Sequence, residues 1–321
     1  MSTLSKQELQ QGADIVYAHM TPTPQICWPL LSQRVGAEVW VKHENHAPTG
    51  AFKVRGGLTY MARLKAEQPQ CPGVVAATRG NHGQSIALAA AKSDMSATIL
   101  VPYGNNPEKN AAMRAYGAEL IEHGTDFEEA RLYANDLAED RSLHMVPSFS
   151  PWLVQGVASY GMELFTAVPD LDTVYVPIGL GSGICSVIAA RDAMGATADI
   201  VGVVAENAAS YALSFEAKKA ISTNSADTLA DGMACRVPDM AALEIIWAGA
   251  DRVITLSEAD ILDAMGIYFK DTHNSSEGAG AAPLAGLIKE KSKMKGKKVG
   301  LILSGGNADA GLFSQALARA Q

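Results

Sequence analysis

Short runs of apolar, mostly β-branched residues alternate with alanine-rich stretches of helical spacing along almost the whole chain. Short runs that are apolar on both faces are typical of strands buried in a parallel sheet. The pattern predicts strands at 37–42, 74–78, 98–101, 173–176, 200–205 and 299–303. It predicts helices at 84–93, 107–116, 126–139, 184–194, 258–269 and 281–291. This alternation predicts an α/β fold with an open, mainly parallel sheet.

Three of the predicted strands run into loops that carry polar residues or glycines. These loops are residues 78–84, 179–183 and 304–307. In an open α/β sheet, ligands bind in the crevice outside the carboxyl ends of the strands, where such loops gather. We therefore expect the ligand-binding chemistry to be concentrated in these three loops.

Composition and charge narrow the class of protein. A chain of 321 residues, 48% hydrophobic and 19% charged, is typical of a globular protein with one large domain or two lobes. Basic residues total 26 against 34 acidic ones, so the net charge of −8 disfavours nucleic acid as a partner. No apolar run approaches the ~18 residues of a membrane span, so no membrane contact is expected. The four cysteines form no Cys-x-x-Cys pair and follow no secretory signal, which favours a cytoplasmic protein.

The loop at 179–183 has the sequence Gly-Leu-Gly-Ser-Gly and lies between a predicted strand and a predicted helix. Glycines let the backbone approach a phosphate group closely, and the free N–H groups of a helix N-terminus attract an anion. The dinucleotide pattern Gly-x-Gly-x-x-Gly is absent because Ile184 stands at its third glycine, and there is no Gly-Lys-Ser/Thr motif. The loop therefore indicates a phosphate cradle or an ordinary tight turn, and it disfavours NAD and ATP.

Lys53, the loop 78–84 and Ser304 are further candidates for chemistry. A desolvated lysine can act as a Schiff-base nucleophile or a general base, although most lysines are surface residues. The loop 78–84 offers hydroxyl, amide and backbone donors that suit a carboxylate, or it simply caps a helix. Ser304 ends the last strand, where it meets a buried heteroatom or belongs to a plain turn before the final helix.

Taken in order, these segments resemble the threonine dehydratase and serine racemase group of fold-type II pyridoxal-phosphate (PLP) enzymes. The resemblance rests on Phe-Lys-x-Arg-Gly at 52–56, Gly-Asn-His-Gly-Gln at 80–84, the glycine-rich loop at 179–183 and Ser-Gly-Gly-Asn at 304–307. Each motif alone is weak, but together, in family order over nearly the whole chain, they are highly specific.

The resemblance implies a tryptophan synthase β-like fold of two open α/β lobes with mainly parallel sheets. A large PLP-binding domain would comprise residues 1–48 and 150–321. A small domain, residues 49–149, would carry Lys53 and the loop that binds the substrate carboxylate. A homodimer is also expected from the resemblance.

The resemblance also assigns roles by position. Lys53 would hold PLP covalently and act as the catalytic residue. The other cofactor-binding residues would be Phe52 beside the ring, Asn81 at its 3-oxygen, Ser304 at its nitrogen, Glu277 close by, and Gly179, Leu180, Gly181, Ser182 and Gly183 around the phosphate. The substrate carboxylate would be bound by Thr78, Arg79, Asn81 and His82.

A serine at the pyridine nitrogen bears on the reaction. A neutral hydroxyl cannot keep that nitrogen protonated as a carboxylate would, so the ring is a weaker electron sink. This favours expulsion of a β-leaving group over transamination. We therefore expect elimination from a β-hydroxy amino acid, such as threonine, serine or 3-phenylserine, to a 2-oxo acid and ammonia. The alternatives are 3-hydroxyaspartate dehydration, β-replacement as in cysteine synthases, and non-catalytic binding of a phosphorylated ligand.

Arg79 departs from the family pattern, which has a hydroxyl residue at this position. In the family's racemases this hydroxyl residue is a serine, which exchanges a proton with the substrate on the face opposite the lysine. A guanidinium stays protonated, so we expect little or no racemase activity. We expect Arg79 either to recognise the substrate, by pairing with its carboxylate or a second anionic group or by stacking on an aromatic ring, or to form a salt bridge with the scaffold. The choice of substrate depends on Arg79 and on residues 148–152, where the pattern is also altered.

Two further departures concern metals and regulation. Some relatives bind a divalent cation through a glutamate and an aspartate six positions later. Here Glu206 matches the glutamate but Ala212 replaces the aspartate, so no strong Mg²⁺ or Ca²⁺ site is expected. Because the sequence ends shortly after Ser-Gly-Gly-Asn, we expect no regulatory domain of the kind that biosynthetic threonine dehydratases append, and hence a catabolic or detoxifying role without isoleucine feedback.

Overall fold

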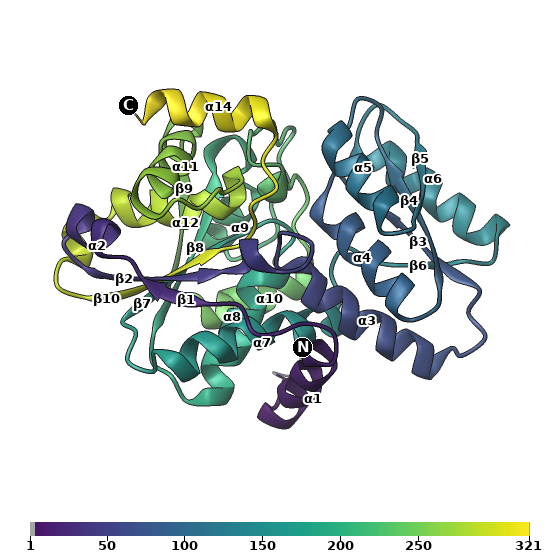
Figure 1. Ribbon diagram of the computed structural model, residues 1–321, viewed down its shortest axis with the longest axis horizontal. Coiled ribbons are helices and arrows are strands. Elements are labelled where there is room, and N and C mark those ends of the chain that lie inside the picture. Colours follow the sequence, from purple (N-terminus) through teal and green to yellow (C-terminus); the bar gives the residue numbers. More distant parts are fainter. Residues whose placement is uncertain (1–3, 321) are drawn as a thin grey trace.

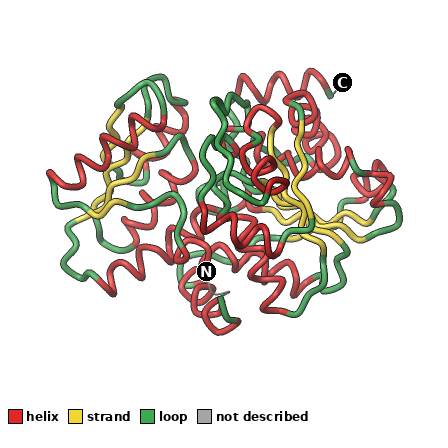
Figure 2. The backbone as a smooth tube through the Cα atoms, turned by 180° about the vertical axis from the view of Figure 1, so that it is seen from behind, coloured by secondary structure: helices red, strands yellow, loops and turns green. Residues whose placement is uncertain are grey.

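The protein contains two separate β-sheets, which lie side by side in Figure 1. The structure is a computed structural model and describes residues 4–320. Figure 2 shows that many of the connecting loops lie between the two groups of strands. Within the described residues, no helix has both the length and the apolar character that a membrane span requires.

The larger sheet has six strands in the order β1-β2-β10-β7-β8-β9. All neighbouring strands are parallel except β1, which pairs antiparallel with β2. The strands are β1 (Gln25–Cys27), β2 (Glu38–His43), β7 (Thr173–Pro177), β8 (Asp199–Ala205), β9 (Arg252–Leu256) and β10 (Lys298–Leu303). The helices around this sheet are α1 (Lys6–Tyr17), α2 (Pro29–Val35), α7 (Pro151–Ala167), α8 (Ser182–Met194), α9 (Ser210–Ala217), α10 (Met240–Gly249), α11 (Glu258–Thr272), α12 (Gly278–Lys289), α13 (Lys291–Met294) and α14 (Ala310–Arg319), with 3-10 turns η1 (Glu44–His46), η2 (Glu206–Ala208) and η3 (Asp231–Met233).

The smaller sheet has four parallel strands in the order β5-β4-β3-β6. The strands are β3 (Gly73–Ala77), β4 (Ser96–Val101), β5 (Glu119–Glu122) and β6 (His144–Met145). The associated helices are α3 (Lys53–Glu67), α4 (Asn81–Lys92), α5 (Pro107–Ala115) and α6 (Phe127–Asp140). Helix α3 packs against both α4 and α7, so it joins the two halves of the molecule.

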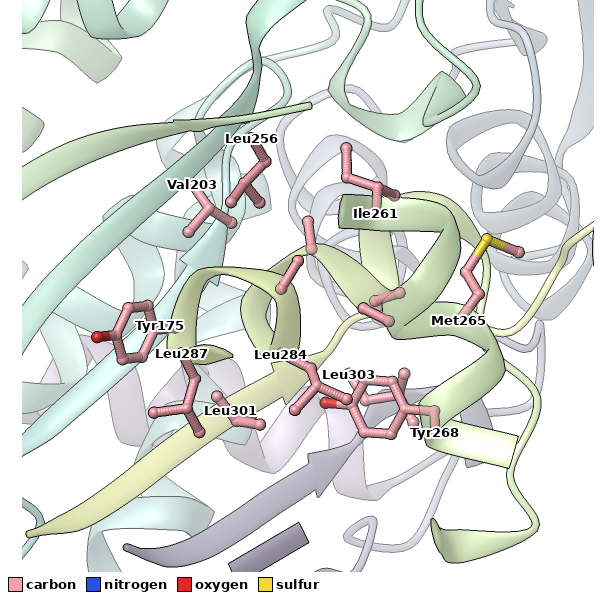
Figure 3. Packing of buried hydrophobic residues seen from close by; sticks show 14 of the residues in the cluster. Tyr175, Val203, Leu256, Ile261, Met265, Tyr268, Leu284, Leu287, Leu301 and Leu303 are labelled. Atoms are coloured by element: carbon pink, nitrogen blue, oxygen red, sulfur yellow. The ribbon is translucent and has the colours of Figure 1, made fainter. Parts of the chain in front are cut away.

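Buried side chains alternate between the two faces of the central strands, as the pleat of a strand requires. On β10, Leu301 and Leu303 belong to one core cluster while Ile302 belongs to another on the opposite face. Figure 3 shows the first cluster, in which Leu303 lies close to Leu284 of α12 and Tyr268 of α11, and Leu301 lies close to Leu287 of α12. Because helices cover both faces, the central strands are apolar throughout, which explains the continuous runs in the sequence.

The prediction of an α/β fold with mainly parallel sheets is confirmed. Each of the six predicted strands is present, and they are the six interior strands of the two sheets. The six predicted helices are also present, with ends that differ by up to three residues. The sequence analysis did not find β1, β5, β6 and β9, which are the four edge strands.

Candidate active site

Lys53 lies at the point where the end of β10 meets the beginning of α3. It is the first residue of α3, and the preceding Phe52 donates a backbone hydrogen bond to the Ser304 carbonyl over 3.0 Å. One residue further out, Ala51 forms an isolated antiparallel bridge with Gly305. Two segments about 250 positions apart in the sequence are therefore fixed side by side, as the family motifs imply.

The Lys53 amine lies in a partly desolvated environment. Its Nζ atom is 3.3 Å from Ser182 Oγ and 5.1 Å from the centre of the Phe52 ring. Burial lowers the pKa of Lys53 to about 8, and the nearby Glu277 carboxylate opposes this shift. At neutral pH a much larger share of this amine is uncharged than of an ordinary lysine, which is what a nucleophile or a base requires.

A buried ion network fixes the first turn of α3 behind Lys53. The Arg55 guanidinium donates to Glu44 of η1 over 2.7 Å and to Glu163 of α7 over 2.6 Å. Both the Arg55 and Glu44 side chains are completely buried, and Lys42 also pairs with Glu163. Charges buried in this way depend on one another, because removing one partner leaves an uncompensated charge in the interior. The network therefore holds the lysine-bearing turn in one position.

The glycine-rich loop has the geometry of an anion cradle. Gly181 has a φ of 100°, and a Cβ atom there would lie 2.6 Å from Ala242 Cβ. A Cβ atom on Gly179 would lie 2.1 Å from the Gly232 carbonyl oxygen, so both positions require glycine. Helix α8 begins at Ser182 without a side-chain cap, which leaves its first N–H groups free for a ligand. The Leu180 carbonyl accepts a hydrogen bond from the Tyr211 hydroxyl, which helps to hold the loop in place.

The loop that precedes α4 is held by Thr78. The buried Thr78 hydroxyl accepts hydrogen bonds from the backbone N–H groups of Gly80 and Gly83. Thr78 therefore caps the helix, which is one of the two roles expected for the loop 78–84. The Asn81 side chain at the start of α4 is not needed for capping and contacts other residues. Burial lowers the pKa of His82 to about 3, so the imidazole is neutral at physiological pH. Its Nε2 atom is buried and has no partner within residues 4–320.

Asn81 is the centre of a chain of side-chain hydrogen bonds. Its amide nitrogen donates to Glu277 Oε1 over 2.7 Å, and its carbonyl oxygen accepts from Asn307 Nδ2 over 2.8 Å. Asn307 Nδ2 also donates to the Thr49 carbonyl. The Asn81 amide has two N–H groups, so one remains available for a ligand. Burial raises the pKa of Glu277, which favours its protonated form.

Ser304 and Arg79 complete the set of predicted residues. Ser304 is buried at the end of β10, and its hydroxyl makes no hydrogen bond to any residue between 4 and 320. It is therefore able to meet a polar atom of a ligand. Arg79 is exposed and forms no ion pair with the described part of the chain. The structure therefore does not contain the scaffold salt bridge that was one interpretation of Arg79.

These features fit PLP. A desolvated lysine, an uncapped helix N-terminus behind glycines that tolerate no side chain, and a buried hydroxyl without a partner correspond to its aldehyde, phosphate and ring nitrogen. A phosphate at the start of α8 would have the N–H groups that such a helix end leaves unpaired.

Comparison with known proteins agrees with this fit. A family model described as pyridoxal-phosphate dependent enzyme matches residues 16–305. This chain belongs to that family. Its cofactor is accordingly pyridoxal 5′-phosphate.

Individual relatives of this PLP-dependent enzyme are similar over most of their length. The L-threonine ammonia-lyase of Thermotoga maritima is 34% identical over 287 residues, which are 89% of this chain and 71% of the relative. The catabolic L-threonine dehydratase of Staphylococcus aureus is 33% identical over 312 residues, 95% of this chain and 90% of the relative. Among solved structures, maize serine racemase superposes with a TM-score of 0.92 at 26% identity, covering 99% of this chain and 98% of that one.

Three residues of this PLP-dependent enzyme lie at the site without having been predicted. Asn307 belongs to the Ser-Gly-Gly-Asn motif but was given no role of its own; its amide contacts Asn81, whereas Asp309 caps α14. The position of Asn307 directly after Ser-Gly-Gly was the feature of the sequence that could have indicated its place at the site. Lys109 and Asp231 form an ion pair next to Glu277, and no local pattern marks them.

Proposed function

We propose that this enzyme catalyses the β-elimination of a β-hydroxy amino acid to a 2-oxo acid and ammonia. The observation that carries the proposal is the backbone hydrogen bond from Phe52 to the Ser304 carbonyl, which holds the segment of the desolvated Lys53 next to the end of β10, where Ser304 lies. Lys53 would bind PLP, and the other residues assigned to the cofactor are Phe52, Asn81, Glu277, Ser304 and residues 179–183. When bound, PLP supplies an electron sink that acidifies the α-carbon of the substrate.

Lys53 would remove the α-proton, because its lowered pKa makes an uncharged amine accessible near neutral pH. The β-hydroxyl group would then accept a proton and leave as water. The unsaturated product takes up water on hydrolysis and releases ammonia. The net reaction converts one β-hydroxy amino acid into one 2-oxo acid and one ammonium ion, so its atoms balance without an oxidant or a reductant.

The substrate carboxylate would bind at the start of α4. Thr78, Asn81 and His82 line this loop, and the first-turn N–H groups of α4 that Thr78 does not bind attract an anion. A neutral His82 can donate a hydrogen bond without adding a charge that would attract other anions. Arg79 would add a positive charge at the same loop, since it is exposed and has no carboxylate partner of its own within the described chain.

Threonine and serine are the first substrates to test, because the curated relatives are named for threonine. 3-Phenylserine and 3-hydroxyaspartate are also candidate substrates, because Arg79, which is exposed and forms no ion pair within residues 4–320, can bind an aromatic ring or a second carboxylate. The second candidate reaction, β-replacement with an added thiol or amine, uses the same lysine. Serine supplied alone separates the two, because elimination yields pyruvate and ammonia without a second substrate.

We further propose that residues 49–149 form a small domain and residues 1–48 and 150–321 a large one. The division of the strands supports this, because β3 to β6 form one sheet and the others form the second. We also propose a cytoplasmic homodimer. Light scattering of the purified protein at several concentrations tests the dimer, and a mass of one chain would contradict it.

The proposed function is tested with a panel of β-hydroxy amino acids. Purified enzyme loaded with PLP is incubated with each L-isomer, and 2-oxo acid and ammonia are measured together. We expect at least one member of the panel to yield 2-oxo acid and ammonia in equal amounts. The Lys53→Ala variant should yield neither product. Consumption of serine only in the presence of a thiol would instead support β-replacement.

A further inference from the structure

In addition to the buried Arg55 network, an ion pair between Lys109 and Asp231 connects the two halves of the molecule beside the proposed active site. Lys109 of α5, next to the four-stranded sheet, contacts Asp231 of η3, which belongs to the other half, with Nζ and Oδ2 2.9 Å apart. The Lys109 side chain is 11% exposed and that of Asp231 38% exposed. The Lys109 end of the pair is therefore shielded from water, whereas the Asp231 end is partly exposed.

The Lys109 side chain reaches Asp231 across the loop that carries Asn81. A Cβ atom on Gly80 would lie 2.9 Å from Lys109 Cδ, so the lysine stem lies directly against this loop. Because Gly80 has no side chain, the stem can pack closely there. Movement of the Asn81 loop away from the other half would therefore have to displace Lys109 as well.

On the other side, Asp231 lies in a turn that contacts two more parts of the site. The Gly232 carbonyl lies where a Cβ atom on Gly179 would be, so the turn packs against the glycine-rich loop. A Cβ atom on Gly232 would lie 4.0 Å from Glu277 Oε1. Lys109, Asp231 and Glu277 also line one small crevice of about 20 Å³, together with Asn307 and Asp309. A space of this size holds about one water molecule.

We propose that Lys109 and Asp231 are a positioning pair, which holds the Asn81 loop against Glu277 and the glycine-rich loop in the catalytically active arrangement. Neither residue needs to touch the substrate, because each acts through Asn81 and Glu277. The kinetic part of this inference rests on the proposed function, whereas the closure of the two halves does not.

The electrostatics of Glu277 provide a readout that a purely structural contact would not change. Burial raises the pKa of Glu277, and Asp231 raises it further. Lys109, the hydrogen bond from Asn81, and Lys53 lower the pKa of Glu277. Asp309 also faces the crevice from the segment before α14. Removing Lys109 therefore raises the pKa of Glu277, and removing Asp231 lowers it.

The kinetic test compares Lys109→Met, Asp231→Asn and the charge-swapped double variant Lys109→Asp with Asp231→Lys, all loaded with PLP. We expect kcat/KM to fall about threefold in each single variant, from the value of a partly shielded ion pair, and to recover in the swap. The limb of the pH profile that reports Glu277 should move to higher pH in Lys109→Met and to lower pH in Asp231→Asn. Shifts in the same direction, or no shift, would overturn the proposal.

Hydrogen–deuterium exchange tests the closure without using activity. The peptides that cover residues 78–84 and 228–233 should exchange faster in both single variants than in the unchanged enzyme. The matched control is Arg114→Met, which removes a charge from the same helix α5; Arg114 pairs with Glu122 of the same half at 3.7 Å. Unchanged exchange in both peptides would overturn the proposal even in an enzyme that proves to have another substrate. Faster exchange in an enzyme without dehydratase activity would instead contradict the proposed function alone.

Discussion

Asn307 Nδ2 lies 2.8 Å from Asn81 Oδ1, and this hydrogen bond connects the segment after β10 to the first turn of α4. The same nitrogen donates to the Thr49 carbonyl, four residues before Lys53. One side-chain amide therefore holds three segments that are far apart in the sequence. A Cβ atom on Gly50 would lie 2.4 Å from Asn307 Oδ1, so the Asn307 side chain packs directly against the backbone near Lys53.

Replacing Asn307 should impair the site. Asn307→Ala leaves the Asn81 and Thr49 oxygens without their donor, which costs about 1–3 kcal/mol for a buried group. We expect kcat/KM to fall about tenfold. Asn224→Ala, which removes an exposed amide from a loop, serves as the control and should leave activity unchanged. Equal activity of the two variants would show that the Asn307 contact has no functional role.

The glycine-rich loop should not accept a side chain at Gly181. Gly181→Ala places a methyl group 2.6 Å from Ala242 Cβ at a φ of 100°, so we expect a loss of stability of about 2 kcal/mol and weaker PLP binding. Gly195→Ala is the matched control, since Gly195 also has a positive φ of 67° but no neighbour within 4 Å. It should lose about 1 kcal/mol and bind PLP normally. Fluorescence titration of each apoenzyme with PLP measures the difference, and equal affinities would contradict the role of the loop.

The lowered pKa of Lys53 predicts how reconstitution depends on pH. Only the uncharged amine reacts with the PLP aldehyde, and its fraction falls about tenfold for each pH unit below the pKa. With a pKa of about 8, the rate of PLP attachment to the apoenzyme should rise up to pH 8 and then level off. Free Nα-acetyl-lysine, measured in parallel, corrects for the titration of PLP itself. A rate that rises until pH 10.5, the value of an ordinary lysine, would show that Lys53 is not desolvated.

Because Arg79 stands where the family's racemases have a serine, we expect the enzyme not to racemise serine. A guanidinium is a poor proton acceptor near neutral pH, so Arg79 cannot replace the serine that exchanges a proton in the family's racemases. Incubation of the enzyme with L-serine should therefore release pyruvate without forming D-serine, as followed by chiral chromatography. Appreciable interconversion of the two serine isomers would show that another residue exchanges the proton.

The interior of the fold was predictable from the sequence, whereas its edges were not. Central strands such as 299–303 are apolar on both faces because helices cover both, so they appear as continuous apolar runs. The edge strand β5 has glutamates at both ends and partly exposed residues between them, so it lacks this pattern. Helix α3 was missed because it contains Gly56 and Gly57, which normally disfavour a helix. A side chain at Gly56 would lie 2.9 Å from the Leu153 carbonyl of α7, so these glycines serve close packing.

The candidate site was predictable only in part. Lys53 and Ser304 belong to motifs with a recognisable order, and the structure brings them together. Lys109 and Asp231 belong to no motif, and their meeting depends on how the two halves pack. Pairing across such a boundary leaves no periodic trace in either segment, so only the three-dimensional structure reveals it.

The central claim is that the side chain of Lys53 carries the cofactor, and peptide mass spectrometry tests it most directly. The enzyme is loaded with PLP, reduced with borohydride to make the link irreversible, and digested. The peptide that contains Lys53 should carry the added mass of the reduced cofactor, and no other lysine peptide should do so. An unmodified Lys53 in fully loaded, reduced enzyme, or the modification on a different lysine, would contradict the account.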